Sequence, residues 1–172
     1  LAKIKRKFFG NLSTHILENN FSNEKIQNNV DAYLDGYWQS ESYFGDAKQL
    51  KEFSFKFKLD LNSENLRLIN YIKSTNSVSL HVRRGDYNGN SIYCLCDELY
   101  YINAIKLLQN HVDNMVIFVF SDNMSWIKDN LLASLPSKIE IYLVENNSAD
   151  SSVDLRLMSL CKHNIIANSS FS

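Results

Sequence analysis

The stretches SVSLHVR, residues 77–83, and MVIFVF, residues 115–120, decide the expected fold of this chain. Both have the length and the β-branched and aromatic content of a strand. The second is apolar at every position, so both of its faces should be buried. In the first, Val78, Leu80 and Val82 alternate with polar residues, which places His81 on the opposite face. Strands of this kind are typical of a parallel sheet covered by helices.

Helical and strand-like segments alternate along the chain around these two strands. Helices are predicted at 46–54, 63–74, 97–110, 122–134 and 151–161. Further strands are predicted at 139–144, as another buried strand, and at 164–167. This alternation predicts an α/β fold, with a Rossmann-like parallel sheet and helices on both faces.

Side chains that cap helices mark several of these boundaries. Ser63 and Asp97 are expected to cap the helices that begin beside them, because their oxygens can accept a bond from a free backbone N–H. Ser151 and Asp154 have the Ser-x-x-Asp spacing of a capping pair. Pro136 should end the helix before it.

The first quarter of the chain carries weaker signals. Residues 1–30 are polar and rich in Asn, and short helices are predicted there. The segment AYLDGYWQSESYF, residues 32–44, is dense in aromatic residues around Gly36 and favours a strand that leads into a turn.

Composition excludes several classes of protein. The chain has 172 residues with 18 Lys and Arg against 19 Asp and Glu, so it lacks the positive charge of a general nucleic-acid binder. Three cysteines do not make a disulfide framework, and no apolar run approaches a membrane span of about 20 residues. A cytoplasmic protein is expected. The basic start at 3–7 beside Phe8 and Phe9 gives weak support for contact with a membrane surface.

Candidate binding residues follow the predicted strands. Ligands of open parallel sheets bind beyond the carboxyl ends of the strands. The polar residues found there are Arg83, Arg84, Asp86, Ser121, Asp122, Glu145, Asn168, Ser169 and Ser170. Arginines with hydroxyl and amide groups suit a phosphorylated ligand. The glycine-rich loops of dinucleotide dehydrogenases and P-loop NTPases do not occur, so neither class is expected.

Each of these residues also has a purely structural interpretation. The arginines could form surface ion pairs with Asp86 or Glu145, and Asp86 could cap a turn or brace Arg83. His81 could be a core residue, and Asp154 is already explained as a cap. Ser121 and Asp122 could cap a helix. A zinc site at Cys94, Cys96, Cys161 and His163 is a minor alternative, because the spacing is unusual.

Three blocks, taken in order, resemble those of one enzyme family. HVRRGDY (81–87) resembles the first signature of the α1,2-, α1,6- and O-fucosyltransferases. FVFSDNMSW (118–126) and DLRLMSLCKHNIIANSSFS (154–172) resemble the second and third blocks of the α1,2-fucosyltransferases, and YLDGYWQSESYF (33–44) is similar to the aromatic segment before them. The chain is identified as a member of this family, glycosyltransferase family 11.

The resemblance implies an architecture and an activity. Residues 33–172 would form the GDP-sugar-binding, C-terminal domain of a GT-B type enzyme with two Rossmann-like domains, and this domain is expected to be incomplete at its C-terminus. Residues 1–32 would be a helical lead-in or a remnant of the N-terminal region. The enzyme would transfer L-fucose from GDP-β-L-fucose to a sugar hydroxyl of a glycan, with inversion to an α1,2 link. Another linkage, another nucleotide sugar, or a non-catalytic GDP-binding domain are the alternatives.

The resemblance also implies roles for individual residues. One arginine would contact the diphosphate while the other organises the site, in place of a metal, so no metal cofactor is expected. The residues with an implied catalytic role are Arg83, Arg84 and Asp86. The residues with an implied donor-binding role are His81, Arg84, Ser121, Asp122, Asp154, Asn168, Ser169, Ser170 and Phe171.

Overall fold

The computed structural model divides the chain into two compact units, Leu1–Lys56 and Phe57–Ser172. It describes residues 15–18, 33–37, 57, 61–87, 89, 94–145, 147 and 150–172.

The first unit contains a small parallel pair of strands. Strand β1 (His15–Leu17) pairs with β2 (Tyr33–Asp35), which lies in the aromatic segment where a strand was predicted. The prediction of short helices is wrong at β1, because pairing with a strand 18 residues away is a long-range effect that local periodicity does not reveal. A bend at Gly36 follows β2, where a turn was predicted, whereas the helix predicted at 46–54 lies outside the described residues.

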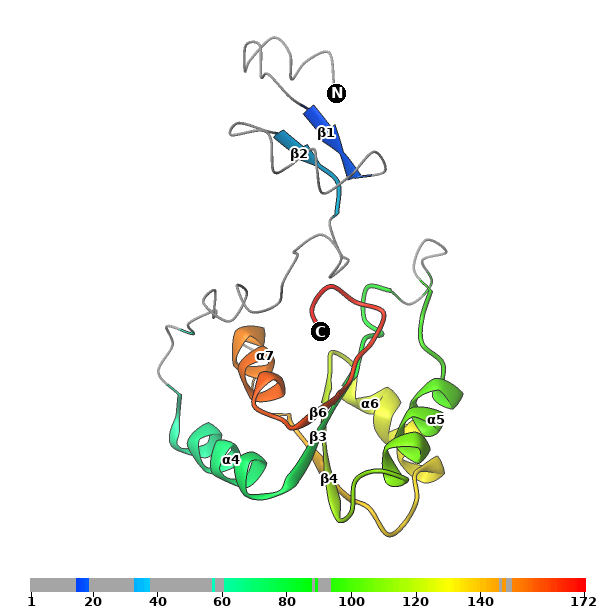
Figure 1. The fold of residues 1–172 in the computed structure, drawn as a ribbon. Coiled ribbons are helices and arrows are strands. Elements are labelled where there is room, and N and C mark those ends of the chain that lie inside the picture. Colours follow the sequence, from blue (N-terminus) through cyan, green and yellow to red (C-terminus); the bar gives the residue numbers. More distant parts are fainter. Residues whose placement is uncertain are drawn as a thin grey trace. The chain divides into compact units, whose positions relative to one another are not determined.

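The second unit is built on a four-stranded parallel sheet, which confirms the predicted Rossmann-like fold (Figure 1). The strands are β3 (Asn76–Val82), β4 (Met115–Ser121), β5 (Glu140–Leu143) and β6 (His163–Ile165). Their order is β5-β4-β3-β6. The chain therefore moves outward from β3 to β5 and then crosses back to place β6 on the other side of β3. Such a switch point opens a crevice beyond the carboxyl ends of the strands.

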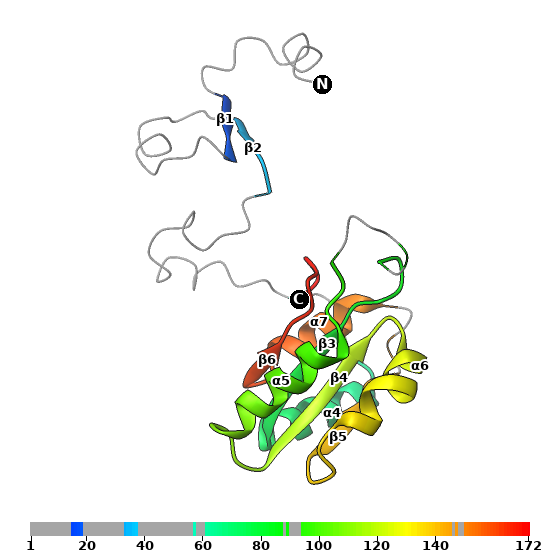
Figure 2. The same ribbon diagram turned by 90° about the vertical axis from the view of Figure 1, so that its right-hand side faces the viewer.

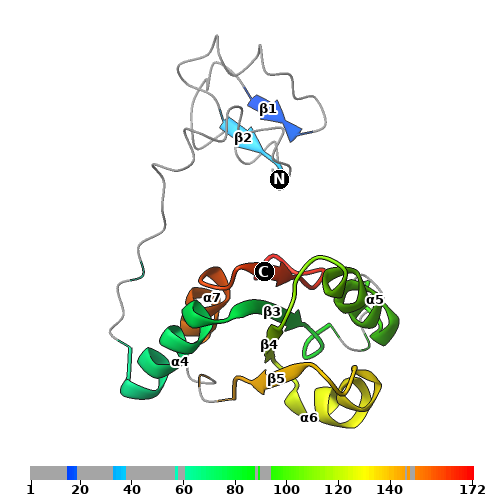
Figure 3. The same ribbon diagram turned by 60° about the horizontal axis from the view of Figure 1, so that its bottom comes forward.

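Helices cover both faces of this sheet (Figures 2 and 3). One face carries α4 (Ser63–Ser74) and α7 (Ser151–Ser159), and the other carries α5 (Glu98–Gln109) and α6 (Met124–Trp126) with the turns that follow it. Strands β3 and β4 lie at the centre and are buried almost throughout, as their sequences predict. Strand β5 was predicted to be equally buried, but as an edge strand it leaves Glu140 and Tyr142 exposed.

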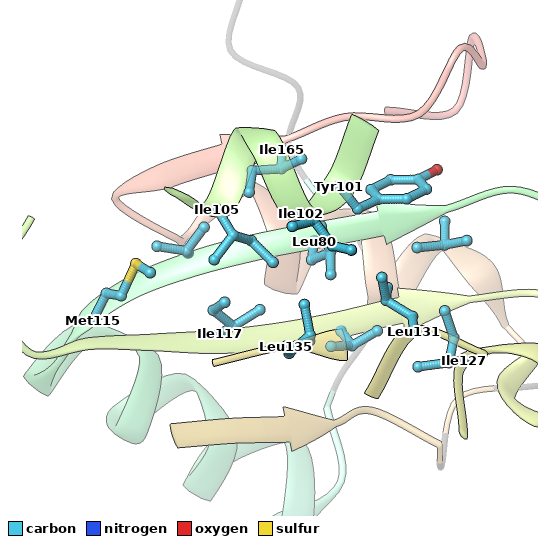
Figure 4. Packing of buried hydrophobic residues seen from close by; sticks show 13 residues of the cluster. Leu80, Tyr101, Ile102, Ile105, Met115, Ile117, Ile127, Leu131, Leu135 and Ile165 are labelled. Carbon is cyan, nitrogen blue, oxygen red and sulfur yellow. The ribbon is translucent and has the colours of Figure 1, made fainter. Parts of the chain in front are cut away.

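Side chains alternate between the two faces of the sheet along β3 and β4, so the sheet separates two hydrophobic cores. Leu80 lies opposite Val119 on the face of α5, where Tyr101 and Ile105 pack against them without solvent exposure (Figure 4). On the other face the partners on β4 include Phe118 and Phe120, which belong to the core under α4 and α7. The positions of β3 on that face are Ser77, Ser79 and His81, all buried. His81 thus lies opposite the apolar row of β3, as the sequence predicts.

The helix starts differ in part from the predicted ones. Asp97 caps α5, as expected, by accepting a bond from the N–H of Tyr100. Helix α4 is capped by Asn62 rather than by Ser63, and α7 by Asp150 rather than by the Ser151 pair. In both helices the oxygen that reaches the free N–H groups comes from the residue before the expected one.

The segment after β4 is not the single regular helix that was predicted. Asn123 caps α6, whose three residues lead into a π-helical segment, η3 (Ile127–Leu131), and a 3-10 turn, η4 (Leu132–Ser134). A π-helical segment holds an extra residue in its turn and occurs often at functional sites. In the described part of the chain, no helix has the length and apolar character needed to cross a membrane.

Candidate functional site

Asp122 ties the loop after β3 to the end of β4. Its carboxylate accepts hydrogen bonds from the backbone N–H of Arg84, at 2.9 Å, and of Gly85, at 3.0 Å. Glycine is required for this approach, because a Cβ at residue 85 would lie 2.6 Å from Oδ2 of Asp122. Asp122 therefore neither caps the next helix nor leaves the space beside Gly85 open. It fixes the path of the loop.

Arg83 is held by two carboxylates. Its Nη2 lies 2.8 Å from Oδ1 of Asp86, and its Nε lies 3.2 Å from Oδ2 of Asp122. The structural interpretation that Asp86 braces Arg83 is thus confirmed. The alternative partner, Glu145, instead pairs with Lys128 at 2.6 Å. The charge of Arg83 is already balanced within the loop.

Arg84 has a different environment. Its guanidinium carbon lies 4.0 Å from the centre of the Trp126 ring, and Nη1 donates to the carbonyl of Cys96 at 3.4 Å. Among the residues that the structure describes, no carboxylate pairs with it. An anion could therefore bind Arg84 without first displacing a carboxylate. This makes Arg84 the better of the two arginines for phosphate binding.

His81 lies at the end of β3, beside the strand-order switch point, and is only 3% exposed. Its ring centre is 5.2 Å from that of Phe171 in the last turn of the chain. Burial lowers the pKa of His81 to about 4, against an opposing effect of Asp122, so the imidazole is neutral at pH 7. Within the described part, buried Nδ1 has no hydrogen-bond partner. A buried nitrogen in this position suits a bond to a ligand.

The C-terminal residues lie at the same edge of the sheet as the loop after β3 (Figure 1). Asn168 donates from Nδ2 to the carbonyl of Cys94 at 3.0 Å, which joins the two segments. Ser169 accepts a bond from the N–H of Phe171 at 3.2 Å, and Ser170 is exposed. These residues do not begin a helix in the described part of the chain. They form turns that follow β6, so the N–H groups here belong to a loop.

Ser121 has a structural role at the end of β4. Its hydroxyl donates to the carbonyl of Val82 at 2.8 Å and accepts from the N–H of Asn123 at 3.0 Å. The first bond connects the ends of β3 and β4, where Arg83 and Asp122 begin the two loops, and the second holds the start of the loop after β4.

Asp154 belongs to a separate polar network. Asn147 donates from Nδ2 to its Oδ1 at 2.8 Å, and Asn65 donates from Nδ2 to Oδ1 of Asn147 at 2.9 Å. This chain joins α4, the loop after β5 and α7. Burial raises the pKa of Asp154, and the bond from Asn147 opposes that shift. Asp154 therefore does not cap α7. It is held by the buried amide of Asn147, which in turn accepts a bond from the buried amide of Asn65.

Apart from Ser121, which connects the ends of β3 and β4, the predicted site residues form three groups. The first surrounds Asp122 and contains both arginines and Asp86. The second joins His81 to Phe171 and the turn at 168–170. The third holds Asp154 through Asn147 and Asn65. Among the described residues, no three His, Cys, Asp or Glu side chains gather in a way that could hold a metal ion, and this includes the cysteines and His163 of the zinc alternative.

Sequence reasoning assigned no role to Trp126, Asn147 or Asn65. Trp126 ends the second family-like block, and Asn147 lies in the polar turn after the third predicted strand, so their positions carried a signal. Asn65 lies within a helix, and its sequence context contains no signal of a functional role.

Comparisons with known proteins show which family the chain belongs to. The family model described as glycosyl transferase family 11 matches residues 6–172. The chain is 41% identical over 142 residues to an alpha-1,2-colitosyltransferase of Escherichia coli, covering 80% of this chain and 48% of the relative. It is 34% identical over 146 residues to the O-antigen biosynthesis glycosyltransferase WbnK of Escherichia coli, covering 76% and 47%. The chain spans about half the length of these curated relatives. It belongs to glycosyl transferase family 11.

Proposed function

We propose that this chain carries the donor-binding part of an inverting α1,2-glycosyltransferase that uses GDP-β-L-fucose and a sugar hydroxyl of a glycan. The single observation that supports this most strongly is Arg84. It lies at the carboxyl end of a central parallel strand, its backbone is fixed by Asp122, and its guanidinium has no carboxylate partner in the described part of the chain. Such a group suits the diphosphate of a nucleotide sugar.

The chemistry of the transfer explains why this charge matters. As the bond from the sugar to the diphosphate breaks, negative charge grows on GDP and the anomeric carbon gains oxocarbenium character. A charge-assisted hydrogen bond contributes about 1.5–3 kcal/mol. Since 1.36 kcal/mol is a factor of ten in rate, one arginine that binds the leaving diphosphate accounts for roughly a 10- to 100-fold acceleration. In this proposal arginine takes the place of a metal ion.

The other two groups fit the remainder of the donor. His81 offers a neutral ring nitrogen beside the switch point, next to the turn at Asn168–Phe171. Asp154 offers a carboxylate that Asn147 keeps oriented. Carboxylates accept bonds from the ring N–H and the amino group of guanine, whereas uracil and adenine do not present that pair of donors. The proposal therefore includes a preference for GDP.

The donor sugar has one serious competitor. The E. coli relative at 41% identity is named for colitose, which is fucose without its hydroxyl at C3. A site that hydrogen-bonds the C3 hydroxyl of fucose would leave a polar group unpaired when colitose binds, which lowers kcat/KM for the colitose donor by a large factor. A site for either sugar would thus discriminate between the two donors. Colitose from GDP-colitose is therefore the second candidate.

Transfer assays on the full-length protein test the proposal. GDP-fucose, GDP-colitose and a UDP-sugar are each supplied with a galactoside acceptor in the presence of EDTA, and the product is identified by mass and by its anomeric NMR signals. We expect α1,2-linked fucose from GDP-fucose. Transfer from GDP-colitose alone would select the second candidate. GDP binding without any transfer would leave the non-catalytic alternative, and transfer only with added Mg²⁺ or Mn²⁺ would contradict the role of arginine.

A further inference from the structure

We propose that Trp126 is a positioning residue that holds the guanidinium of Arg84 in place for the diphosphate. This inference rests on the proposed function. Trp126 lies on the short helix α6 after β4, whereas Arg84 follows β3, so a contact between parallel neighbouring strands brings the two together. Their separation of 4.0 Å, from the guanidinium carbon to the ring centre, is that of a cation–π contact.

Residues 122–126, after β4, contact both the backbone and the guanidinium of Arg84. Asp122 binds its backbone N–H at 2.9 Å, and Trp126, four residues later, contacts its guanidinium. The position of an arginine head group normally depends on several flexible torsions. Here the backbone and the head group are both held by residues 122–126, so a defined distance separates the diphosphate ligand from the strand end. This arrangement is the preorganisation that catalysis by a fixed charge requires.

The backbone of Trp126 is itself held by two asparagine side chains. Oδ1 of Asn123 accepts a bond from the N–H of Trp126 at 2.9 Å, and Nδ2 of Asn130 donates to its carbonyl at 3.0 Å. The bond from Asn130 spans the start of the π-helical segment η3. The ring is thus presented from a backbone position that is fixed on both sides.

An aromatic ring is a suitable partner for a phosphate-binding arginine. A carboxylate partner, such as those of Arg83, would have to be displaced by an incoming anion. A ring face attracts the guanidinium without accepting hydrogen bonds from its N–H groups as a carboxylate would. One of them meets the carbonyl of Cys96. Stacking therefore supplies orientation without competing for the charge.

Core packing alone explains the position of Trp126 less well than the positioning role does. The next residue of the same segment, Ile127, is completely buried in the core under α5, and so is Leu131, whereas Trp126 is only partly buried. Ile127 provides a matched control, because a change there affects the core and leaves the ring that contacts Arg84 unaltered.

The test is a double-mutant cycle measured by calorimetric titration of the full-length protein with GDP in EDTA. Trp126→Leu should weaken GDP binding about tenfold, and Trp126→Phe should restore most of it, because phenyl also stacks on a guanidinium. In an Arg84→Ala background Trp126→Leu should have no further effect. Ile127→Val should lower the melting temperature and leave GDP affinity unchanged.

Two results would overturn the inference while leaving the proposed function intact. One is wild-type GDP affinity in Trp126→Leu. The other is an equal loss of affinity from Trp126→Leu with and without Arg84, which would mean that the tryptophan acts independently of it. If the wild-type protein itself fails to bind GDP, the proposed function is wrong, and the positioning role is rejected with it.

Discussion

The carboxylate of Asp122 occupies the space that a side chain at Gly85 would need. Oδ2 of Asp122 accepts the N–H of Gly85 at 3.0 Å, and it would lie 2.6 Å from a Cβ at that position. The same carboxylate also holds the N–H of Arg84 and contacts the guanidinium of Arg83. One acidic residue after β4 therefore sets the course of the loop that carries both arginines.

Gly85→Ala should damage this arrangement. The added methyl group must displace the Asp122 carboxylate, which we expect to cost about 1–3 kcal/mol of unfolding free energy. GDP affinity should fall as well, because both N–H bonds of the loop are disturbed. Denaturant unfolding and calorimetry measure the two effects. A wild-type unfolding free energy together with a wild-type GDP affinity would show that the bonds between Asp122 and the loop have no importance for stability or binding.

Arg84→Lys should weaken GDP binding at least tenfold and lower kcat/KM by the same order. Lysine keeps the charge but loses the planar donors and the stacking on Trp126. The melting temperature should change little, because no carboxylate in the described part is left unpaired by the change. Arg67→Lys, at an exposed position of α4, is the matched control. A variant that unfolds but retains its GDP affinity would make Arg84 a structural residue.

Asn147→Asp should make stability depend on pH through Asp154. The aspartate can still accept the bond from Asn65, but it loses the donor to Asp154 and places a second carboxylate beside it. At pH 7 both groups are charged and repel each other, whereas at pH 4.5 one proton can be shared between them. The loss of unfolding free energy should therefore be larger at pH 7. Asn103→Asp, on the exposed side of α5, should show no such difference, and an equal loss at both pH values would argue against the network.

His81 should contribute to acid sensitivity. Burial lowers its pKa to about 4 in the folded protein from 6.5 in the unfolded chain, so the unfolded state binds more protons between these values. Stability is therefore fully present above about pH 6.5 and is lost as the pH falls toward 4. Between pH 7 and 4.5 the wild-type protein should lose about 2.5 kcal/mol more unfolding free energy than His81→Gln. The exposed His111→Gln variant should behave like the wild type, and identical pH curves for wild type and His81→Gln would contradict a buried neutral imidazole.

Much of the sheet could be predicted from the chain, because its signals are local. The apolar run at 115–120 and the alternation around His81 identify β4 and β3 by period alone. The exposure of β5 could not be predicted, since strand order rather than composition makes it an edge. Strand β1 was missed for a similar reason, because its partner is distant in sequence.

The site was predictable as a set of positions but not as a set of contacts. The rule that ligands bind beyond parallel strands identified Arg83, Arg84 and Asp122 correctly as neighbours. It could not show that Asp122 binds the loop backbone, or that Trp126 rather than a carboxylate contacts Arg84. These contacts depend on the register between β3 and β4 and on the irregular helix after β4.

The most direct test of the account is calorimetric titration of the full-length protein with GDP, UDP and ADP, each in the presence of EDTA. We expect GDP to bind most tightly, with an affinity that chelation leaves unchanged and that Arg84→Lys lowers at least tenfold. Equal affinities for the three nucleotides, or loss of GDP binding in EDTA, would contradict the claim that Arg84 and its neighbours form a metal-independent site for a GDP-activated sugar.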